Sequence, residues 1–439
     1  MKALILASGE GRRLSSVRKE NPKPLVKFLG LSLIERVLFS LKKVGIKEVV
    51  IVLGYLGEKI QERLGDGSRY GISISYAYND EWQRGNGISV LKGKKNLISE
   101  ERFLLLMSDH VFDYQILQEL IEKSSDKGNF LCVDKSVPSH VKLDDATKVK
   151  VEGDKITDIG KRIKDYNAID TGIFFLTSDI FKALEESIHQ GDDTLSGGVK
   201  VLARQGKIKA VDISGKFWAD IDTEGDYKKA QDFMLKNLIK VTDGWVSRHL
   251  NRPLSIKLSR YIVNTKLTPN MISFFCFLLS CFSALFYGFG SYLNVLIGGI
   301  LAQISSILDG CDGEIARLKF QESEYGAWFD AVLDRYADAL IILGMSYGKW
   351  LMEGNINYWI WGTIALIGCF MNSYTASKYD AVFLKKKKSP KFRFGRDIRF
   401  FIIFIGSLLN QIFLVLMILG IISNVESIRR IFALRRDLE

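Results

Sequence analysis

The pattern of hydrophobic and polar positions divides the chain into two parts of different character. From residue 1 to about residue 233, short apolar runs alternate with amphipathic stretches, and charged residues occur throughout. This pattern predicts a soluble α/β domain that opens with a buried strand at residues 2–7. After about Thr242, long apolar segments recur and predict helices of membrane-spanning length.

The second part contains several such apolar segments. They cover residues 271–289, 292–308, 327–347, 356–375 and a longer run at 398–422. Basic residues gather around Arg317, at residues 378–399 and at residues 429–436. The turns at the other ends of the predicted helices, near residues 288–291 and 349–355, hold a single lysine, Lys349. Since cytosolic loops carry the excess of Lys and Arg, these three regions share one side only if the number of spans is even. We therefore divide the last run near Asn410 and predict six transmembrane helices, with five long ones as the alternative.

The segment between the two parts, residues 253–266, is too short and too charged to span a bilayer. Its mixture of apolar and basic positions predicts a helix that lies on the cytosolic membrane surface, and an ordinary linker helix is the alternative. The predicted organisation is a soluble domain at 1–235, a linker with an interfacial helix at 236–268, and an all-α membrane domain at 269–439.

Composition adds constraints on partners and compartment. The 439 residues carry a net charge of +11, which suits anionic lipid headgroups and phosphorylated substrates. No nucleic-acid-binding motif accompanies this charge, so we expect no nucleic-acid partner. The five cysteines are odd in number and lack metal-site spacing, which predicts a reducing environment without a disulfide framework. The first residues lead directly into a strand, so we expect no cleavable signal peptide.

A cluster of acidic residues lies at the edge of the apolar region. It follows the pattern D-x2-D-G-x2-A-R-x8-G-x3-D-x3-D, from Asp309 through Asp312 and Asp330 to Asp334. Asp309 and Asp312 are three residues apart, and Asp330 and Asp334 are four apart. If the chain is helical at both places, each pair projects from one helix face. Carboxylates beside a membrane require neutralisation, and hard oxygen ligands suit Mg²⁺ or Mn²⁺. The pattern therefore predicts a divalent-metal site, and a solvated acidic loop is the alternative.

This pattern resembles the signature of the CDP-alcohol phosphotransferases, membrane enzymes that displace CMP from a CDP-alcohol with a second alcohol. The resemblance implies that Asp309, Asp312 and Asp330 hold two metal ions. It also implies that Asp334 assists at the metal site and acts as the general base on the attacking hydroxyl. The other specified positions are implied to bind the nucleotide and its phosphates: Gly313, Ala316, Arg317 and Gly326.

Chemistry is also indicated near the start of the soluble part. The first predicted strand leads into S-G-E-G-R-R-L at residues 8–14, a glycine loop whose backbone N–H groups can surround a triphosphate. N-P-K-P-L follows at residues 21–25. Together these resemble the sugar-phosphate nucleotidyltransferases. The resemblance implies that Lys23 and either Arg12 or Arg13 neutralise the triphosphate, which is bound by Gly9 and Gly11. A Rossmann-like domain with an unrelated use is the alternative.

Later segments match the same family in order. Residues 84–89, with Asn86 and Gly87, resemble its base- and ribose-binding loop, and residues 169–173 resemble a strand near the acceptor pocket. A buried strand at 104–108 ends at Asp109, where α/β folds place ligand-binding groups. Asp109 is implied as the first metal ligand and Asp220 or Asp222 as the second, with Asp220 preferred for its place after the aromatic residue.

Some positions depart from the family or leave their role open. Ser8 replaces the usual alanine, and Glu10 adds a negative charge beside the triphosphate loop, so reduced or lost activity remains an alternative. His110 follows Asp109 directly and is either a base or a packing residue.

The two parts together resemble a family of bifunctional enzymes over nearly the whole chain. That resemblance implies a first reaction of CTP with inositol-1-phosphate to give CDP-inositol. A second reaction with another inositol-1-phosphate then gives a phosphorylated inositol phosphodiester and CMP. It also implies a homodimer. From the basic loops, we expect both sites on the cytoplasmic side of the membrane. Mg²⁺ or Mn²⁺ is the expected cofactor, with two ions in the membrane site and at least one in the soluble site.

A phosphorylated acceptor requires cations beside the metals. Lys378, Arg396 and Arg399 flank the last helices on that side and are the candidates, with ordinary membrane anchoring as the alternative. The lysine run at 385–388 is interpreted as such an anchor. Two other functions stay open: a phospholipid synthase with an inactive soluble domain, and a transporter with a nucleotide-sensing module.

Overall fold

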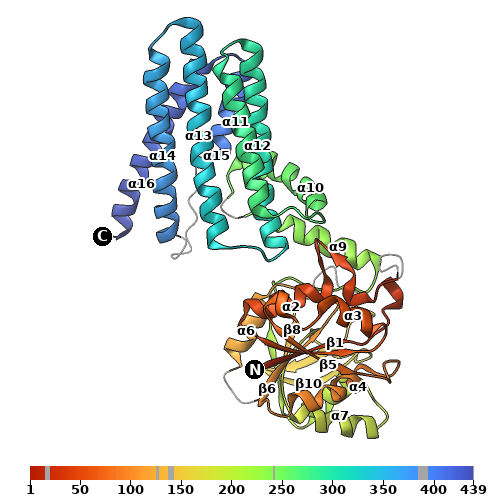
Figure 1. Cartoon of the computed structure of the whole chain (residues 1–439). Helices are drawn as coiled ribbons and strands as arrows, with labels where there is room; N and C mark the ends of the chain where they lie inside the picture. Colours follow the sequence, from red (N-terminus) through yellow and green to blue (C-terminus); the bar gives the residue numbers. More distant parts are fainter. Residues whose placement is uncertain (15–19, 125–127, 137–142, 241–242, 384–393, 439) are drawn as a thin grey trace. The chain divides into compact units, whose positions relative to one another are not determined.

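The computed structural model describes residues 1–14, 20–124, 128–136, 143–240, 243–383 and 394–438, with side chains for all of these except 380–383 and 434–438. It divides into two compact units, Met1–Phe233 and Met234–Glu439 (Figure 1). The predicted lysine anchor at 385–388 lies outside the described residues.

The first unit is built on a mixed sheet, as the hydrophobic pattern predicted. In the described part of the chain its strand order is β5-β4-β1-β6-β11-β8-β12-β10-β9. The strands are β1 (Lys2–Ala7), β4 (Glu48–Leu53), β5 (Ser73–Tyr78), β6 (Arg102–Met107), β8 (Asn129–Asp134), β9 (Lys148–Glu152), β10 (Lys155–Gly160), β11 (Ala168–Thr177) and β12 (Ile208–Asp212). Strands β5, β4, β1 and β6 run parallel, and β11 is antiparallel to β6. The sheet is therefore Rossmann-like on one side and mixed on the other.

Helices cover both faces of this sheet and bury two separate apolar clusters against it (Figure 1). One face carries α2 (Leu33–Lys43), α3 (Gly57–Leu64) and α6 (Gln115–Lys123). The other carries α4 (Asn86–Lys92), α5 (Lys94–Leu97), α7 (Asp179–His189) and α8 (Leu195–Arg204). Helix α9 (Glu224–Lys236) follows the last strand.

Four short elements carry candidate site residues: η1 (Arg12–Leu14), η2 (Lys23–Leu25) and the paired strands β7 (His110–Phe112) and β13 (Trp218–Asp220). The other short elements are η3 (Ser68–Tyr70) and the paired strands β2 (Lys27–Phe28) and β3 (Leu31–Ser32). Strands β1 and β6 are parallel neighbours, so the loops that follow them lie at the same edge. The register of β13 on β7 places Asp220 opposite His110.

The second unit is helical. Its elements are η4 (Ser247–Asn251), α10 (Arg252–Ile262), α11 (Pro269–Gly288), α12 (Tyr292–Leu318), α13 (Glu324–Glu353), α14 (Asn357–Phe383), α15 (Arg396–Leu408) and α16 (Ile412–Leu438). Side-chain caps begin two of the helices, with Thr268 accepting from Met271 before α11 and Ser323 accepting from Gly326 before α13. The last apolar run is broken between α15 and α16 at Asn410, which has a left-handed backbone (φ 53°). The break lies where the sequence predicted it.

Within the described residues, three helices are long and apolar enough to cross a membrane: Pro269–Gly288, Tyr292–Leu318 and Ile412–Ala433. Helix α13 carries Asp330, Asp334, Arg335 and Asp338 on its first half, which lowers its hydropathy. Helix α15 has only 13 residues. Six spans therefore stay a prediction, although the apolar helices themselves are as expected.

Helix α12 continues through the acidic motif instead of ending before it. The hydrophobic pattern suggested an end near residue 308, whereas the helix runs to Leu318. Polar residues from Asp309 onward mark the end of the apolar surface and not the end of the helix. The acids of the motif are consequently held on rigid secondary structure.

Candidate active sites

Lys23 is the centre of the candidate site in the first unit. Its ammonium lies 2.6 Å from Asp109, 2.7 Å from Asp222 and 3.7 Å from Asp220. The side chain is buried, and Pro22 and Pro24 restrict the backbone on both sides of it. Burial alone would lower the pKa of Lys23, but the charges of these three aspartates outweigh it and raise the pKa. The lysine is therefore held charged beside three carboxylates.

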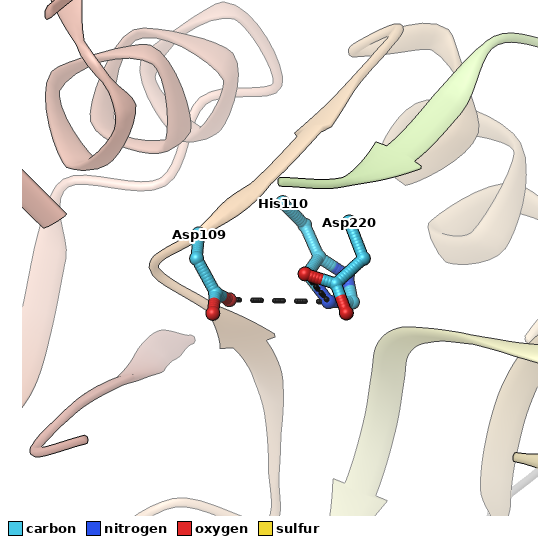
Figure 2. Close-up of side chains that lie close together, drawn as sticks. All are labelled: Asp109, His110 and Asp220. Carbon is cyan, nitrogen blue, oxygen red and sulfur yellow. Dashed lines mark ion pairs between the residues drawn. The ribbon is translucent and has the colours of Figure 1, made fainter. Parts of the chain in front are cut away.

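Asp109, His110 and Asp220 form a group that could hold a metal ion (Figure 2). One ligand atom from each lies within 4.8 Å of the others, and the imidazole Nε2 is 3.9 Å from Asp109 and 3.8 Å from Asp220. The two carboxylates are hard oxygen donors that suit Mg²⁺ and Mn²⁺, whereas an imidazole is a donor preferred by softer transition metals. Asp222 does not belong to this group and instead contacts Lys23 and Arg13.

The electrostatics of this group differ between its two acids. Burial raises the pKa of Asp109, but Lys23 and His110 outweigh that effect and lower it to about 2. For Asp220 burial prevails over the same two cations and raises the pKa to about 6. Burial lowers the pKa of His110, but Asp220 and Asp109 outweigh it and the pKa is raised.

The ring of His110 is fixed by strand β11. Its Nδ1 lies 2.9 Å from the carbonyl oxygen of Thr171. Gly172 has a positive φ of 72°, and a Cβ atom at that position would overlap the imidazole ring. The sequence left a packing role open for His110, and the structure brings the residue into the acidic site.

The glycine loop lies beside Lys23. Gly11 has a φ of 65°, and a Cβ atom there would lie 2.7 Å from the Cβ of Lys23. Arg13 contacts Asp145 at 2.6 Å and Asp222 at 2.5 Å, whereas the Arg12 side chain is 80% exposed and contacts Glu10 at 2.6 Å. The structure therefore brings Arg13, and not Arg12, to the acids around Lys23.

Two cavities adjoin this cluster and share Asn86, Met107, Asp109 and Asp222. One has a volume of about 390 Å³ and is lined by the glycine loop together with Lys23, Trp82 and Arg84. The other, of about 300 Å³, is lined on its far side by Asp145, Thr147, Lys161, Asp170, Ser196 and Trp218. Both cavities reach Asp109, so two ligands bound in them would meet at the acidic cluster.

Asn86, which lines both cavities, and Gly87, which lines neither, begin helix α4. The side-chain oxygen of Asn86 accepts a hydrogen bond from the backbone of Leu195, and Gly87 donates to the carbonyl of Asp193. Sequence analysis did not assign Lys161 or Asp145. Neither has a motif around it, so only the folded chain shows that they line the cavity.

The second candidate site lies where α12 faces α13. One carboxylate oxygen from each of Asp309, Asp330 and Asp334 lies within 4.8 Å of the others, so this group could hold a metal ion. Asp312 accepts a hydrogen bond of 2.5 Å from Ser273 and is in hydrogen-bonding contact with Asp330. The four predicted acids are thus brought together, and their hard oxygen donors suit divalent cations.

Arg396, at the start of α15, enters this acidic group. One of its terminal nitrogens lies 2.6 Å from Asp334 and 3.1 Å from Asp309. Its Nε lies 3.3 Å from Asp338, which also contacts Arg399 at 2.9 Å. Sequence analysis assigned both arginines but not Asp338, whose spacing of four residues after Asp334 was the available signal.

A cavity of about 220 Å³ opens beside Arg396. It is lined by Asp334, Arg335, Asn372, Ser373, Ala376, Ser377, Phe394, Gly395, Arg396, Arg399 and Arg430. Arg430 was not assigned from the sequence because it resembled one of several basic residues in a cytosolic tail. Lys378 is exposed on α14 and does not line this cavity.

The remaining motif residues lie around the end of α12 and the start of α13. A Cβ atom on Gly313 would lie 3.3 Å from Arg317, whose guanidinium donates to the carbonyl of Leu238 at 3.2 Å. Gly326 donates its N–H to the capping oxygen of Ser323. Ala316 is half-buried one turn after Asp312.

Each of these two sites lies in a part of the chain that matches a known protein family. Residues 2–237 match the nucleotidyl transferase family, and residues 266–425 match the CDP-alcohol phosphatidyltransferase family. The chain is accordingly an enzyme that joins a nucleotidyltransferase domain to a CDP-alcohol phosphotransferase domain.

Known relatives carry both domains in one chain. The bifunctional IPC transferase and DIPP synthase of Aquifex aeolicus is 36% identical over 98% of this chain and 97% of its own length. The protein of the same name from Rubrobacter xylanophilus is 34% identical over 99% of this chain and 96% of its own length. This chain belongs to the family of bifunctional IPC transferases and DIPP synthases. The inositol-1-phosphate CTP transferase structure from T. maritima is 30% identical and covers 52% of this chain and 94% of its own, with a TM-score of 0.46.

Proposed function

We propose that this enzyme makes CDP-inositol from CTP and inositol-1-phosphate, and then transfers the phosphoinositol group to a second inositol-1-phosphate with release of CMP. The product of the second reaction is a phosphorylated inositol phosphodiester. The observation that carries this proposal is the full-length similarity to relatives named for both activities. The two acidic sites also support this proposal, since each has a cationic side chain, Lys23 or Arg396, and an adjoining cavity.

In the first reaction, a phosphate oxygen of inositol-1-phosphate attacks the α-phosphorus of CTP, and the bond to pyrophosphate breaks. CTP occupies the cavity of the glycine loop, where Gly9 and Gly11 face its phosphates and Asn86 faces its ribose and base. Gly87 follows Asn86 at the start of α4 and supports this nucleotide loop. Lys23 and Arg13 neutralise the triphosphate. Inositol-1-phosphate occupies the adjoining cavity, since both cavities reach Asp109.

In the second reaction, a hydroxyl of the acceptor attacks the phosphorus that carries inositol, and CMP leaves. Asp334 takes the proton of that hydroxyl. The phosphate of the acceptor enters the cavity beside Asp334, where Arg396, Arg399 and Arg430 supply positive charge. The CDP moiety is contacted by Gly313, Ala316, Arg317 and Gly326. Lys378 contacts the acceptor phosphate from outside the cavity.

We infer that Mg²⁺ or Mn²⁺ serves both sites. Asp309, Asp312, Asp330 and Asp334 hold two ions in the membrane site, and Asp109 with Asp220 holds at least one in the soluble site. When bound, such ions neutralise the phosphate oxygens and stabilise the charge that develops on the leaving group.

We propose further that the helical domain spans a cell membrane several times, with both sites on the cytoplasmic side. The three apolar helices and the basic loops support this orientation. The soluble domain comprises 1–235 and the membrane domain 269–439, joined by a linker in which α10 lies on the membrane surface. The exposed Leu254, Leu258 and Tyr261 of α10 suit contact with lipid. The family resemblance supports a homodimer.

Phosphorus NMR tests both reactions in one tube. The intact chain and Asp334→Asn are incubated with CTP, Mg²⁺ and inositol-1-phosphate. We expect CDP-inositol to accumulate with Asp334→Asn, and a new phosphodiester with CMP to appear only with the intact chain. If CTP survives in both samples, the soluble domain is inactive on this substrate. CMP release from a CDP-lipid would then favour a phospholipid synthase.

A further inference from the structure

The acidic motif of α12 has a second face, which packs on helix α10. Gly310, Cys311 and Glu314 lie on this back face and contact helix α10. The spacing of 310, 311 and 314 places these residues on one side of an α-helix. None of the three is a predicted ligand or nucleotide contact.

Glu314 is the central residue of the back face. Its side chain is 0% exposed. One carboxylate oxygen accepts from Ser255 at 2.6 Å and from Arg252 at 2.9 Å, and the other accepts from Ser259 at 2.7 Å. All three donors belong to α10, so this single carboxylate connects three positions of α10 to the motif.

Arg252 holds the same face from the start of α10. Besides Glu314, its guanidinium donates to the carbonyl of Gly310 at 3.2 Å and to Asp243 at 2.9 Å. A Cβ atom on Gly310 would lie 3.1 Å from both Arg252 and Ser255. The two helices therefore approach closely at Gly310, where any side chain would have to displace Arg252 or Ser255 by a few tenths of an ångström.

We propose that Glu314 and Arg252 are positioning residues for the metal site: they fix the rotation of α12 so that Asp309 and Asp312 face Asp330 and Asp334. This inference rests on the function proposed for the membrane site. Carboxylate oxygens lie roughly 5 Å from the helix axis, so a rotation of about 20° would move them by roughly 2 Å. A displacement of that size is large for a metal site, in which ligand distances are held to within about 0.2 Å, so the carboxylates would bind an ion together less tightly.

Metal affinity distinguishes positioning from simple stabilisation. Mn²⁺ binding is followed by electron paramagnetic resonance on the full-length chain carrying Asp220→Asn, which weakens binding at the soluble site. In that background we expect Glu314→Gln and Arg252→Gln each to weaken Mn²⁺ binding at the membrane site by about tenfold or more. Because both residues belong to one hydrogen-bonded network, the double variant should be weaker by less than the two single effects combined.

Two buried serines provide a matched pair for variants that keep all charges. Ser259 is on α10 and donates to Glu314. Ser305 is on α12, is also buried, and contacts Ser280 and the carbonyl of Cys276. Ser259→Ala should weaken Mn²⁺ binding by about threefold, and Ser305→Ala should leave it unchanged. If Glu314→Gln fails to fold and Ser259→Ala binds Mn²⁺ as the parent does, the proposal is wrong.

Activity gives the second measurement. With supplied CDP-inositol and inositol-1-phosphate, we expect Glu314→Gln to raise the half-saturating Mg²⁺ concentration for CMP release by about tenfold. The rate at saturating Mg²⁺ should stay within about threefold, and the first reaction should be unchanged. A loss of CMP release that is equal at all Mg²⁺ concentrations, with Mn²⁺ binding intact, would overturn the positioning role. If the parent chain itself releases no CMP, the proposed function fails, and the Mn²⁺ measurement still decides the role of Glu314.

Discussion

The guanidinium of Arg396 lies 2.6 Å from the carboxylate of Asp334, and the same nitrogen is 3.1 Å from Asp309. One cation from α15 thus bridges acids on α12 and α13. In the proposed reaction this cation has two tasks, since it orients the base Asp334 and also lines the cavity for the acceptor phosphate.

Replacement of Arg396 should therefore affect the second reaction alone. We expect Arg396→Gln to slow CMP release from CDP-inositol by about 100-fold, because it removes the positive charge proposed to orient Asp334 and to meet the acceptor phosphate. CDP-inositol formation in the same preparation should not change, which the two assays measure together. Lys378→Gln is the comparison. If Lys378 contacts the acceptor phosphate, the variant should have a raised KM for inositol-1-phosphate. An unchanged KM would show that Lys378 does not belong to the site.

Lys23 should be essential for the first reaction. We expect Lys23→Gln to reduce CDP-inositol formation by about 1,000-fold or more, because it removes the positive charge proposed to neutralise the triphosphate. The second reaction on supplied CDP-inositol should proceed at the parent rate. Formation of CDP-inositol within tenfold of the parent rate would contradict the role of Lys23.

The two neighbouring arginines can be separated in the same way. Arg13 contacts Asp222 and Asp145, whereas Arg12 contacts Glu10 and is largely exposed. We expect Arg13→Gln to raise the KM for CTP by about tenfold and Arg12→Gln to raise it by less than threefold. The opposite order would show that Arg12 turns inward when CTP binds.

Gly172 should be irreplaceable because of His110 and not because of its backbone alone. Both Gly172 and Gly153 have positive φ values, 72° and 63°, but a Cβ on Gly153 would have no neighbour within 4 Å. Each alanine substitution carries a backbone strain of about 1 kcal/mol. We expect Gly172→Ala to slow CDP-inositol formation by about 100-fold and Gly153→Ala by less than twofold. Equal effects would mean that His110 is not required in its present position.

Metal binding at the soluble site should weaken in mild acid. The raised pKa of Asp220, about 6, means that its carboxyl keeps its proton below that pH in the metal-free protein. A ligand must be deprotonated to bind metal, so the half-saturating Mg²⁺ concentration for CDP-inositol formation should rise about tenfold per pH unit below about pH 6. The raised pKa of His110 acts in the same direction, since a protonated imidazole repels the ion. A flat Mg²⁺ requirement between about pH 7 and pH 5 would argue against Asp220 as a ligand.

Much of the fold followed from periodicity. The first strand, the change in character near the middle of the chain and the break at Asn410 all correspond to features of the hydrophobic pattern. The acids Asp309, Asp312, Asp330 and Asp334 could be grouped from spacing alone, because fixed intervals of three and four residues define a helix face. Lys23, Asp109 and Asp220 required a family resemblance, since they are far apart in the chain.

Other members of the sites could not be found in this way. Arg430 and Lys161 have no distinctive neighbours in sequence, and their place is set by packing between distant elements. Asp338 was not assigned, although it continues the four-residue spacing of Asp330 and Asp334. The end of α12 was set too early because apolar character, not helicity, stops at Asp309. The different surroundings of Arg12 and Arg13 also required the fold, because adjacent residues point in different directions only once the backbone is fixed.

The shortness of α15 has a consequence for the surroundings of the membrane site. Its 13 residues extend for about 20 Å, whereas the hydrocarbon core of a bilayer is about 30 Å thick. If the break at Asn410 is near the far interface, Arg396 at the other end of α15 lies roughly 10 Å below the near one. We therefore expect water to reach the acids through a recess in the protein, and the lipid used for reconstitution to matter through its thickness as much as through its charge.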